Sequence, residues 1–193
     1  MRVRHSALVR ITHWTTAASF VALLVSGIAI LLAHPRLYWG ETGALGGPSL
    51  VDLPLPMILT GQSGWGRYLH FLSAWVCVLT GAVYVLGGMR ARHFRNDWFR
   101  PLDPAKYSVT QRVAYAAVVF ALFPLMIWTG FAMSPALTSV FPGLVTVFGG
   151  QQSARTIHFI VTGLLILFVI AHVVMVTAAG FSRHVGAMIL GRT

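Results

Sequence analysis

Four histidines lie inside long apolar runs of the sequence: His13, His70, His158 and His172. An ionisable side chain within a membrane-spanning segment is costly, which makes it a candidate functional residue. Imidazole nitrogen is a good ligand for zinc, copper, nickel and iron. Metal binding is therefore the first chemistry that these residues suggest. The structural alternative is that each ring only hydrogen-bonds a backbone carbonyl of a neighbouring helix.

The spacing of the histidines favours two separate sites. On one helix, the interval from His158 to His172 corresponds to about 21 Å, and both residues return to within roughly 40° of the same face. In the orientation that the charge distribution predicts (below), His70 and His158 each stand near the outer start of a run. His13 and His172 then lie towards the cytoplasmic side. The sequence thus predicts an outer pair, His70 with His158, and an inner pair, His13 with His172.

Each predicted pair supplies only two protein ligands, which points to haem iron. A bare divalent ion takes four or more ligands, whereas haem brings four equatorial nitrogens of its own and leaves two axial positions to fill. The apolar runs contain no carboxylate, and the sequence has no C-x-x-C-H motif for covalent haem attachment. We therefore predict two haem b groups, one for each pair.

Length and hydropathy define the helices that must position these histidines. Of the 193 residues, 56% are hydrophobic and 9% charged, and the mean hydropathy is +0.75. Soluble domains carry about a quarter charged residues, and about 20 apolar residues suffice to cross a bilayer. We predict an all-α membrane protein, a four-transmembrane-helix bundle forming one domain over residues 1–193, with a kink at Pro124. The predicted spans are residues 11–33, 67–89, 110–134 and 156–180.

The charge distribution predicts the orientation in the membrane. The net charge of +10 comes from 14 Lys and Arg against 4 Asp and Glu. All but three of these basic residues lie before the first run, between the second and third, or after the fourth, and the exceptions are Arg36, Arg67 and Arg155. The positive-inside rule then places both termini in the cytoplasm and explains the charge without nucleic acid. The first apolar run is too long for a signal peptide, so we expect no cleaved leader.

Residues near the membrane faces have two interpretations each. Arg10, Arg67 and Arg155 are candidates for pairing with haem propionates, or they are ordinary topology signals. The outer residues 34–67 carry Tyr38, Trp39 and Trp65, which form either an interfacial aromatic belt or a docking face for an extracytoplasmic partner. Gly27, Gly130 and Gly163 either admit a flat macrocycle beside the histidines or serve helix packing.

The residues that open the runs resemble a known family. Arg10-Ile11-Thr12-His13-Trp14, Gly66-Arg67-Tyr68-Leu69-His70, and His158 with His172 are similar to the bacterial di-haem cytochrome b561 family. This family includes the cytochrome b subunits of nickel-iron hydrogenases, formate dehydrogenases and thiosulfate reductases. The resemblance implies a four-helix bundle in the bacterial inner membrane, with His70 and His158 as outer and His13 and His172 as inner haem ligands.

The resemblance also implies a function, which is electron transfer between a periplasmic redox enzyme and the quinone pool. The chain would be the electron-transfer subunit of an oxidoreductase complex rather than a complete enzyme. The long outer loop suggests a particular partner, and the similarity points to a branch associated with a periplasmic molybdenum-cofactor oxidoreductase. Quinone is expected near the inner haem, with Tyr107, Gln111 or Arg112 available for its carbonyls.

Two other functions stay open at this point. A stand-alone superoxide:quinone oxidoreductase of the same fold would need a basic outer surface, but Glu41 and Asp52 offset the three outer arginines. A haem-free membrane assembly or transport subunit would use the histidines for packing alone.

Overall fold

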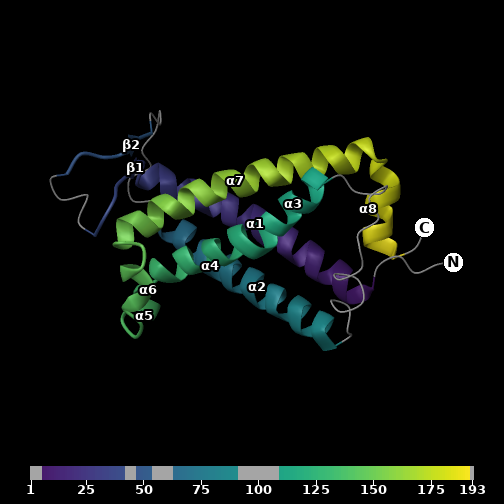
Figure 1. Cartoon of the computed structure of the whole chain (residues 1–193), viewed down its shortest axis with the longest axis horizontal. Helices are drawn as coiled ribbons and strands as arrows, with labels where there is room; N and C mark the ends of the chain where they lie inside the picture. The colour runs from purple at the N-terminus through teal and green to yellow at the C-terminus, as the bar shows by residue number, and fades with distance from the viewer. Residues whose placement is uncertain (1–5, 42–46, 54–62, 91–108, 192–193) are drawn as a thin grey trace. The chain divides into compact units, whose positions relative to one another are not determined.

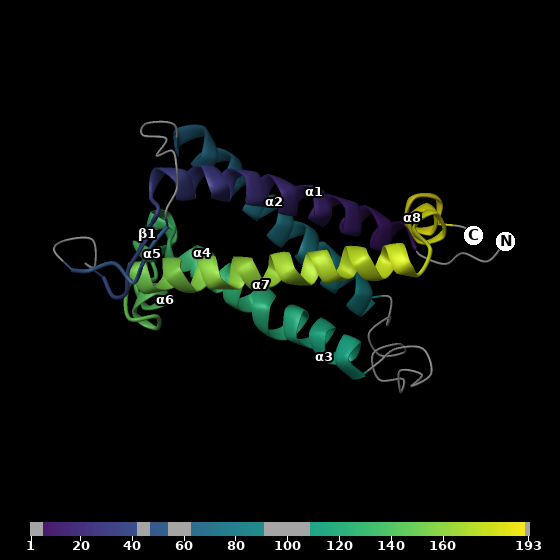
Figure 2. The ribbon, with the colours of Figure 1, turned by 90° about the horizontal axis from the view of Figure 1, so that it is seen from above.

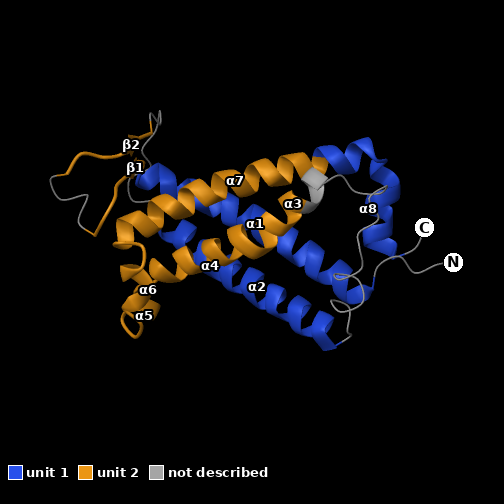
Figure 3. Cartoon of the chain, in the orientation of Figure 1, with its two compact units in different colours: residues 1–34, 56–106, 174–193 blue, residues 35–55, 107–173 orange. Residues whose placement is uncertain are grey.

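The computed structural model describes residues 6–41, 47–53, 63–90 and 109–191. It divides the chain into two compact units, which Figure 3 colours separately. Unit 1 comprises residues 1–34, 56–106 and 174–193, and unit 2 comprises residues 35–55 and 107–173. Each unit combines segments that are distant in the sequence, and the prediction of a single domain over residues 1–193 stays a prediction.

Two long antiparallel helices form the body of unit 1, and they pack side by side (Figure 1): α1 (Ala7–Ala33) and α2 (Ser63–Arg90). Glycines bring the two backbones together at both ends of the contact, where Gly66 packs against Ala29 and Gly87 against Leu8. Small residues of this kind let helices associate closely in lipid. The hydroxyl of Ser6 caps the start of α1 by accepting a hydrogen bond from the Val9 N–H at 3.3 Å.

A short helix at the end of the chain, α8 (Phe181–Leu190), also belongs to unit 1. The chain turns into it at Gly180, whose φ of +103° favours glycine. The indole N–H of Trp14 donates a hydrogen bond to the Met188 carbonyl at 3.1 Å. This bond connects α8 to the first turns of α1.

Unit 2 contains the third span, which is one continuous helix with an irregular centre. It is made of α3 (Val109–Ala117), the π-helical turn η2 (Val118–Leu122) and α4 (Phe123–Ala132). Pro124 has no N–H and its ring crowds the carbonyl four residues earlier, so the backbone widens just before it. The irregularity expected at Pro124 is thus a π turn, a form that concentrates at functional sites.

Two very short helices and a long one complete unit 2 together with a two-stranded sheet. Figure 2 shows the third span running from α3 through α4 towards the short helices. The strands pair Arg36 with Asp52 and Leu37 with Val51 in antiparallel register. The remaining elements of unit 2 are α5 (Pro135–Thr138), α6 (Gly143–Thr146), β1 (Arg36–Leu37), β2 (Val51–Asp52) and α7 (Gln151–Ala178) up to residue 173.

The four long helices have the length and composition of membrane spans, with mean hydropathies of 1.9 to 2.8 in their most apolar windows. Large apolar side chains such as Ile11, Leu72 and Leu167 are exposed, whereas most buried positions are small or hydroxylic, such as Ser26, Thr129 and Ala132. This is the pattern expected of helices whose solvent is lipid. The prediction of a four-span helical membrane protein is confirmed.

The helices of the structure differ from the predicted spans at several ends, and the second helix begins at Ser63 rather than at residue 67. The first helix begins at Ala7 and not at residue 11, because the Ser6 cap extends it. The fourth begins at Gln151 and not at residue 156, so Arg155 lies inside it. The third ends at Ala132 rather than at residue 134, and the strands β1 and β2 add a small sheet to the expected all-α fold.

Residues 36–41, which follow α1, are held to the first turns of α7 by hydrogen bonds. The Gly40 N–H donates to the Ser153 hydroxyl at 2.7 Å, and the Gln152 N–H donates to the Gly40 carbonyl at 3.0 Å. The Thr156 hydroxyl donates to the Tyr38 carbonyl at 2.7 Å. Residues 36–41, which we call the strap, are therefore fixed to the start of α7.

An ion pair joins the two strands of the sheet, of which β1 is the first part of the strap. The Arg36 Nε donates to the Asp52 carboxylate at 3.1 Å, and both side chains are exposed. This hydrogen bond, together with the negative charge of Asp52, raises the pKa of Arg36 above its ordinary value. Because the pair is in water, it fixes the strand register rather than adding much stability.

The two units repeat one sequence pattern on their second long helix. Arg67–Phe71 and Arg155–Phe159 both read Arg-x-x-His-Phe. The histidine of each pattern is the eighth residue of a 28-residue helix, His70 in α2 and His158 in α7. Fourteen residues further on, α2 has Tyr84 where α7 has His172. The helices α2 and α7 therefore carry the same pattern at the same position and differ further along.

The strap gives a first prediction. Gly150 has a φ of +130°, and a Cβ atom at this position would overlap the backbone of Gly40 and Glu41. Gly150→Ala should lower the free energy of unfolding by about 1–3 kcal/mol, seen as a lower Tm of the purified protein in nanodiscs. Gly186→Ala is the control, since no atom lies within 4 Å of a Cβ there. An unchanged Tm for Gly150→Ala would contradict the close contact.

Candidate functional site

The His70 ring in unit 1 is held by a hydroxyl from α1. Its Nδ1 lies 3.0 Å from the Ser26 Oγ, and Ser26 is fully buried. A Cβ added to Gly27 would lie 3.6 Å from the His70 Cε1 and 3.9 Å from its Nδ1. The adjacent residues Ser26 and Gly27 thus provide a hydroxyl and a close backbone approach beside the same imidazole.

The His158 ring in unit 2 has the same surroundings. Its Nδ1 lies 2.9 Å from the Thr129 Oγ1 on α4, and Thr129 is fully buried. A Cβ added to Gly130 would lie 3.8 Å from the His158 Cε1. A hydroxyl residue followed by glycine therefore faces the histidine of the Arg-x-x-His-Phe pattern in both units.

The hydrogen bonds of the two hydroxyls determine the tautomer of the two rings. The Ser26 hydroxyl donates to the Ala22 carbonyl at 2.7 Å, and the Thr129 hydroxyl donates to the Leu125 carbonyl at 2.8 Å. A hydroxyl has one proton and a carbonyl can only accept. Each hydroxyl oxygen must then accept from the imidazole, so the ring proton is on Nδ1. The lone pair of each ring is consequently on Nε2.

His172 is also engaged at Nδ1, by a phenol. Its Nδ1 lies 3.3 Å from the Tyr115 hydroxyl on α3. The Phe168 ring stacks on the His172 ring with centroids 6.1 Å apart and an interplanar angle of 21°, and it meets Tyr115 edge-on at 5.5 Å. Tyr115 stands one turn before the π-helical turn η2.

The other predicted site residues lie nearer the helix ends. His13 is exposed and meets Trp14 edge-on, with ring centroids 5.3 Å apart. The guanidinium of Arg10 lies against Gly191, and its buried Nε makes no hydrogen bond within the described residues. Arg67 is exposed and Arg155 half-buried. An anion would satisfy the buried Arg10 Nε. The role of Arg10, Arg67 and Arg155 as partners of haem propionates stays a prediction.

The predicted pairs each combine one histidine from each unit. His13 and His70 belong to unit 1, and His158 and His172 belong to unit 2. The pairing itself therefore stays a prediction. Among the residues that the structure describes, no group of three or more His, Cys, Asp or Glu side chains converges on one point. Of the residues predicted to bind quinone, Tyr107 and the side chains of Gln111 and Arg112 lie outside the described part of the chain.

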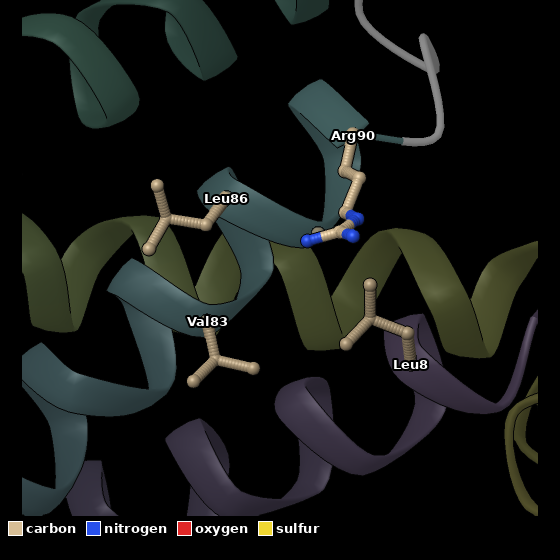
Figure 4. A pocket seen from close by; sticks show the side chains of 5 residues that line it. Leu8, Val83, Leu86 and Arg90 are labelled. Atoms are coloured by element: carbon tan, nitrogen blue, oxygen red, sulfur yellow. The ribbon is translucent and has the colours of Figure 1, made fainter.

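Unit 1 also has an apolar groove of about 650 Å³ between the start of α1 and the end of α2. Figure 4 shows Leu8, Val83 and Leu86 on its walls and the Arg90 guanidinium at one end. It contains none of the four histidines. Its aliphatic lining suits contact with lipid.

Comparison with known proteins identifies the family of the chain. The family model described as "Prokaryotic cytochrome b561" matches residues 4–191. The chain belongs to the prokaryotic cytochrome b561 family. This cytochrome is also similar to the "Putative protein-methionine-sulfoxide reductase subunit YedZ1" of Azospira oryzae, with 27% identity over 212 residues that cover 97% of the chain and 96% of the relative. No solved structure matches it.

The family membership confirms that this is a multi-pass membrane cytochrome of the b type. The histidine geometry fits haem b, because Nε2 is the nitrogen that carries the lone pair in His70 and His158. A metal-ligating histidine ordinarily donates its other N–H to an acceptor that fixes ring and tautomer. Ser26 and Thr129 are such acceptors, and they lie where water is excluded.

Three residues of this cytochrome escaped the sequence analysis: Ser26, Thr129 and Tyr115. The signal for the first two was present in the repeated hydroxyl-glycine pairs Ser26-Gly27 and Thr129-Gly130, of which only the glycines attracted attention. Serine and threonine in apolar helices ordinarily bond the carbonyl four residues earlier, so their type alone gives no reason to single them out. Tyr115 has no comparable signal.

The space beside the two rings leads to a second prediction. A leucine at position 27 or 130 would extend several atoms beyond a Cβ that already touches His70 or His158. We expect Gly27→Leu and Gly130→Leu each to lose about one haem per chain, measured by haem extraction, because the ring is displaced. Alanine at either position should be tolerated, since its Cβ makes an ordinary van der Waals contact.

The control for this prediction is Gly64→Leu, at a position where a Cβ meets nothing within 4 Å. Full haem content in both leucine variants would show that these histidine rings do not need the space that the glycines leave.

Proposed function

We propose that this cytochrome is a di-haem electron-transfer subunit of the bacterial inner membrane. In this proposal His70 and His158 bind the outer haem, and His13 and His172 bind the inner haem. The observation that carries it is the engagement of Nδ1 in His70, His158 and His172 by a side-chain hydroxyl. For His70 and His158 this assigns the lone pair to Nε2, the atom that an axial ligand needs.

The residues of the chain perform the remaining tasks in this proposal. Haem b, when bound, supplies one-electron transfer. The histidines hold haem at two depths in the membrane, and the aliphatic spans keep water away from these sites. The exclusion of water and the hydrogen bonds to the ligands together set the reduction potential of each haem. Arg10 at the inner face and Arg67 and Arg155 at the outer face are the proposed partners for propionates. Tyr107, Gln111 and Arg112 are the proposed quinone-binding residues. Both termini are proposed to lie in the cytoplasm.

The proposed redox partner is an extracytoplasmic oxidoreductase. The printed name of the Azospira relative, a reductase subunit for methionine sulfoxide in proteins, supports a partner of that activity. Reduction of one methionine sulfoxide consumes two electrons and two protons and releases water, and oxidation of one quinol supplies two electrons and two protons. In this proposal electrons would pass outward from quinol to the partner, with His13 and His172 holding one haem and His70 and His158 the other. We propose a molybdenum-cofactor enzyme as partner, as the family resemblance suggested.

The strap is the proposed docking face for this partner. Residues 36–41 are fixed to the start of α7, the helix that carries His158, and Trp39 is 56% exposed. A surface attached to the helix of an outer haem ligand is well placed for electron transfer. The interfacial belt is the alternative for the same tryptophan.

The ligand assignment is tested by single alanine variants of His13, His70, His158 and His172. The wild type should bind two haems per chain and give a b-type α band in the reduced-minus-oxidised spectrum, and each variant should lose one haem because an axial ligand is missing. His184→Ala, which changes a histidine of α8 outside the spans, should keep both. A colourless wild type would instead favour a haem-free assembly subunit, whereas two haems in every variant would overturn the assignment of the four histidines as ligands.

The direction of electron flow is tested with quinol as reductant. Quinol should reduce both haems of the purified protein anaerobically. An extracytoplasmic methionine sulfoxide reductase supplied with methionine sulfoxide as the oxidant should reoxidise them more slowly when Trp39 is replaced by Ala, because the docking contact is lost. The variant should keep the wild-type spectrum. Rapid reduction of the haems by superoxide without any partner would favour the stand-alone superoxide:quinone oxidoreductase.

A further inference from the structure

The two hydroxyl groups that face His70 and His158 form a matched set. Ser26 on α1 and Thr129 on α4 are both fully buried, and each lies about one hydrogen-bond length from an imidazole Nδ1, at 3.0 and 2.9 Å. Each is followed by the glycine that lies beside the same ring. The same local arrangement has thus been built twice, on two hairpins with different sequences.

Neither hydroxyl is free to reverse its hydrogen bond. The Ser26 Oγ lies 2.7 and 3.1 Å from the carbonyls of Ala22 and Leu23, and the Thr129 Oγ1 lies 2.8 and 3.0 Å from those of Leu125 and Met126. All four are acceptors without a proton to give, so the hydroxyl proton stays on its own helix. The imidazole is then the donor in both contacts.

We propose that Ser26 and Thr129 are positioning residues that act on one haem through its two axial histidines. This inference rests on the proposed binding of the outer haem by His70 and His158. Each hydroxyl holds its ring in the Nδ1–H tautomer and, by accepting that proton in a water-free site, makes Nε2 a stronger ligand. A more basic axial ligand favours ferric over ferrous iron, so the two hydroxyls together lower the potential of the outer haem.

The inner ligand His172 is held differently. Its Nδ1 faces the Tyr115 phenol at the longer distance of 3.3 Å, beside the stacked Phe168 ring. The two haems of the proposal therefore receive unlike support, with aliphatic hydroxyls on both outer ligands and a phenol on an inner one. This difference separates their potentials without any change of ligand type.

The experiment compares Ser26→Ala and Thr129→Val with the wild type, using redox titration and low-temperature EPR of the purified holoprotein. We expect the midpoint potential of one of the two haems to rise, the same haem in both variants, with a change in its low-spin EPR signal. Haem affinity should fall by about 10–100-fold, as for other outer-shell partners of metal ligands. Ser26→Thr and Thr129→Ser keep the hydroxyl and should restore wild-type values.

The chain offers a closely matched control at position 162. The Thr162 hydroxyl donates to the backbone carbonyl of His158 at 2.8 Å and does not engage its ring. Thr162→Val removes a hydroxyl from the same helix, one turn from the same histidine, and should leave both potentials unchanged. An effect as large as that of Thr129→Val would show general helix perturbation and overturn the inference.

Other outcomes are also decisive. Unchanged potentials and EPR signals in Ser26→Ala and Thr129→Val, in a protein that binds two haems, would overturn the positioning role alone. Shifts of two different haems would overturn the statement that the hydroxyls act on one haem. A wild type that binds no haem would overturn the proposed function itself, so the two failures are distinguishable.

Discussion

The structure depends on hydroxyl groups that donate to their own helix and accept from a neighbouring histidine. Inside a bilayer there is no water to take the place of a missing partner, so each polar atom must be satisfied by the protein. Ser26 and Thr129 meet this demand for two atoms at once, a helix carbonyl and an imidazole N–H. This shared bond lets a histidine lie in an apolar helix pair with a defined tautomer.

The lipid environment also explains which residues are buried. Large aliphatic side chains face outward, and close contacts within the hairpin of α1 and α2 are made by small residues such as Gly66 and Ala29. Glycine has the further role of leaving room beside a ring, as Gly27 does for His70 and Gly130 for His158. Small residues in these helices therefore serve both packing and the site, and neither interpretation excludes the other.

The same set of residues around a histidine occurs in both units, and the units differ further along their helices. Both units carry the Arg-x-x-His-Phe pattern, the facing hydroxyl and the adjacent glycine. They differ fourteen residues further along the second helix, where Tyr84 stands in α2 and His172 in α7. The third span also contains the π turn η2, which adds a wider coil ahead of Pro124. Unit 1 has His13 near the start of α1 and Tyr84 near the end of α2, whereas in unit 2 His172 near the end of α7 lies beside Tyr115 of α3.

The sequence by itself determined the four spans, the membrane setting and the four histidines, because hydropathy and intramembrane charge are properties of local composition. It also carried the resemblance to the cytochrome b561 family. The tertiary structure decided what a residue type cannot state: that Ser26, Thr129 and Tyr115 face imidazole nitrogens, and that residues 36–41 are strapped to the start of α7. The sequence around a buried serine in an apolar helix is the same whether its hydroxyl has one hydrogen-bond partner or two. Its second partner comes from a helix distant in the sequence, and only folding brings that helix within hydrogen-bonding distance.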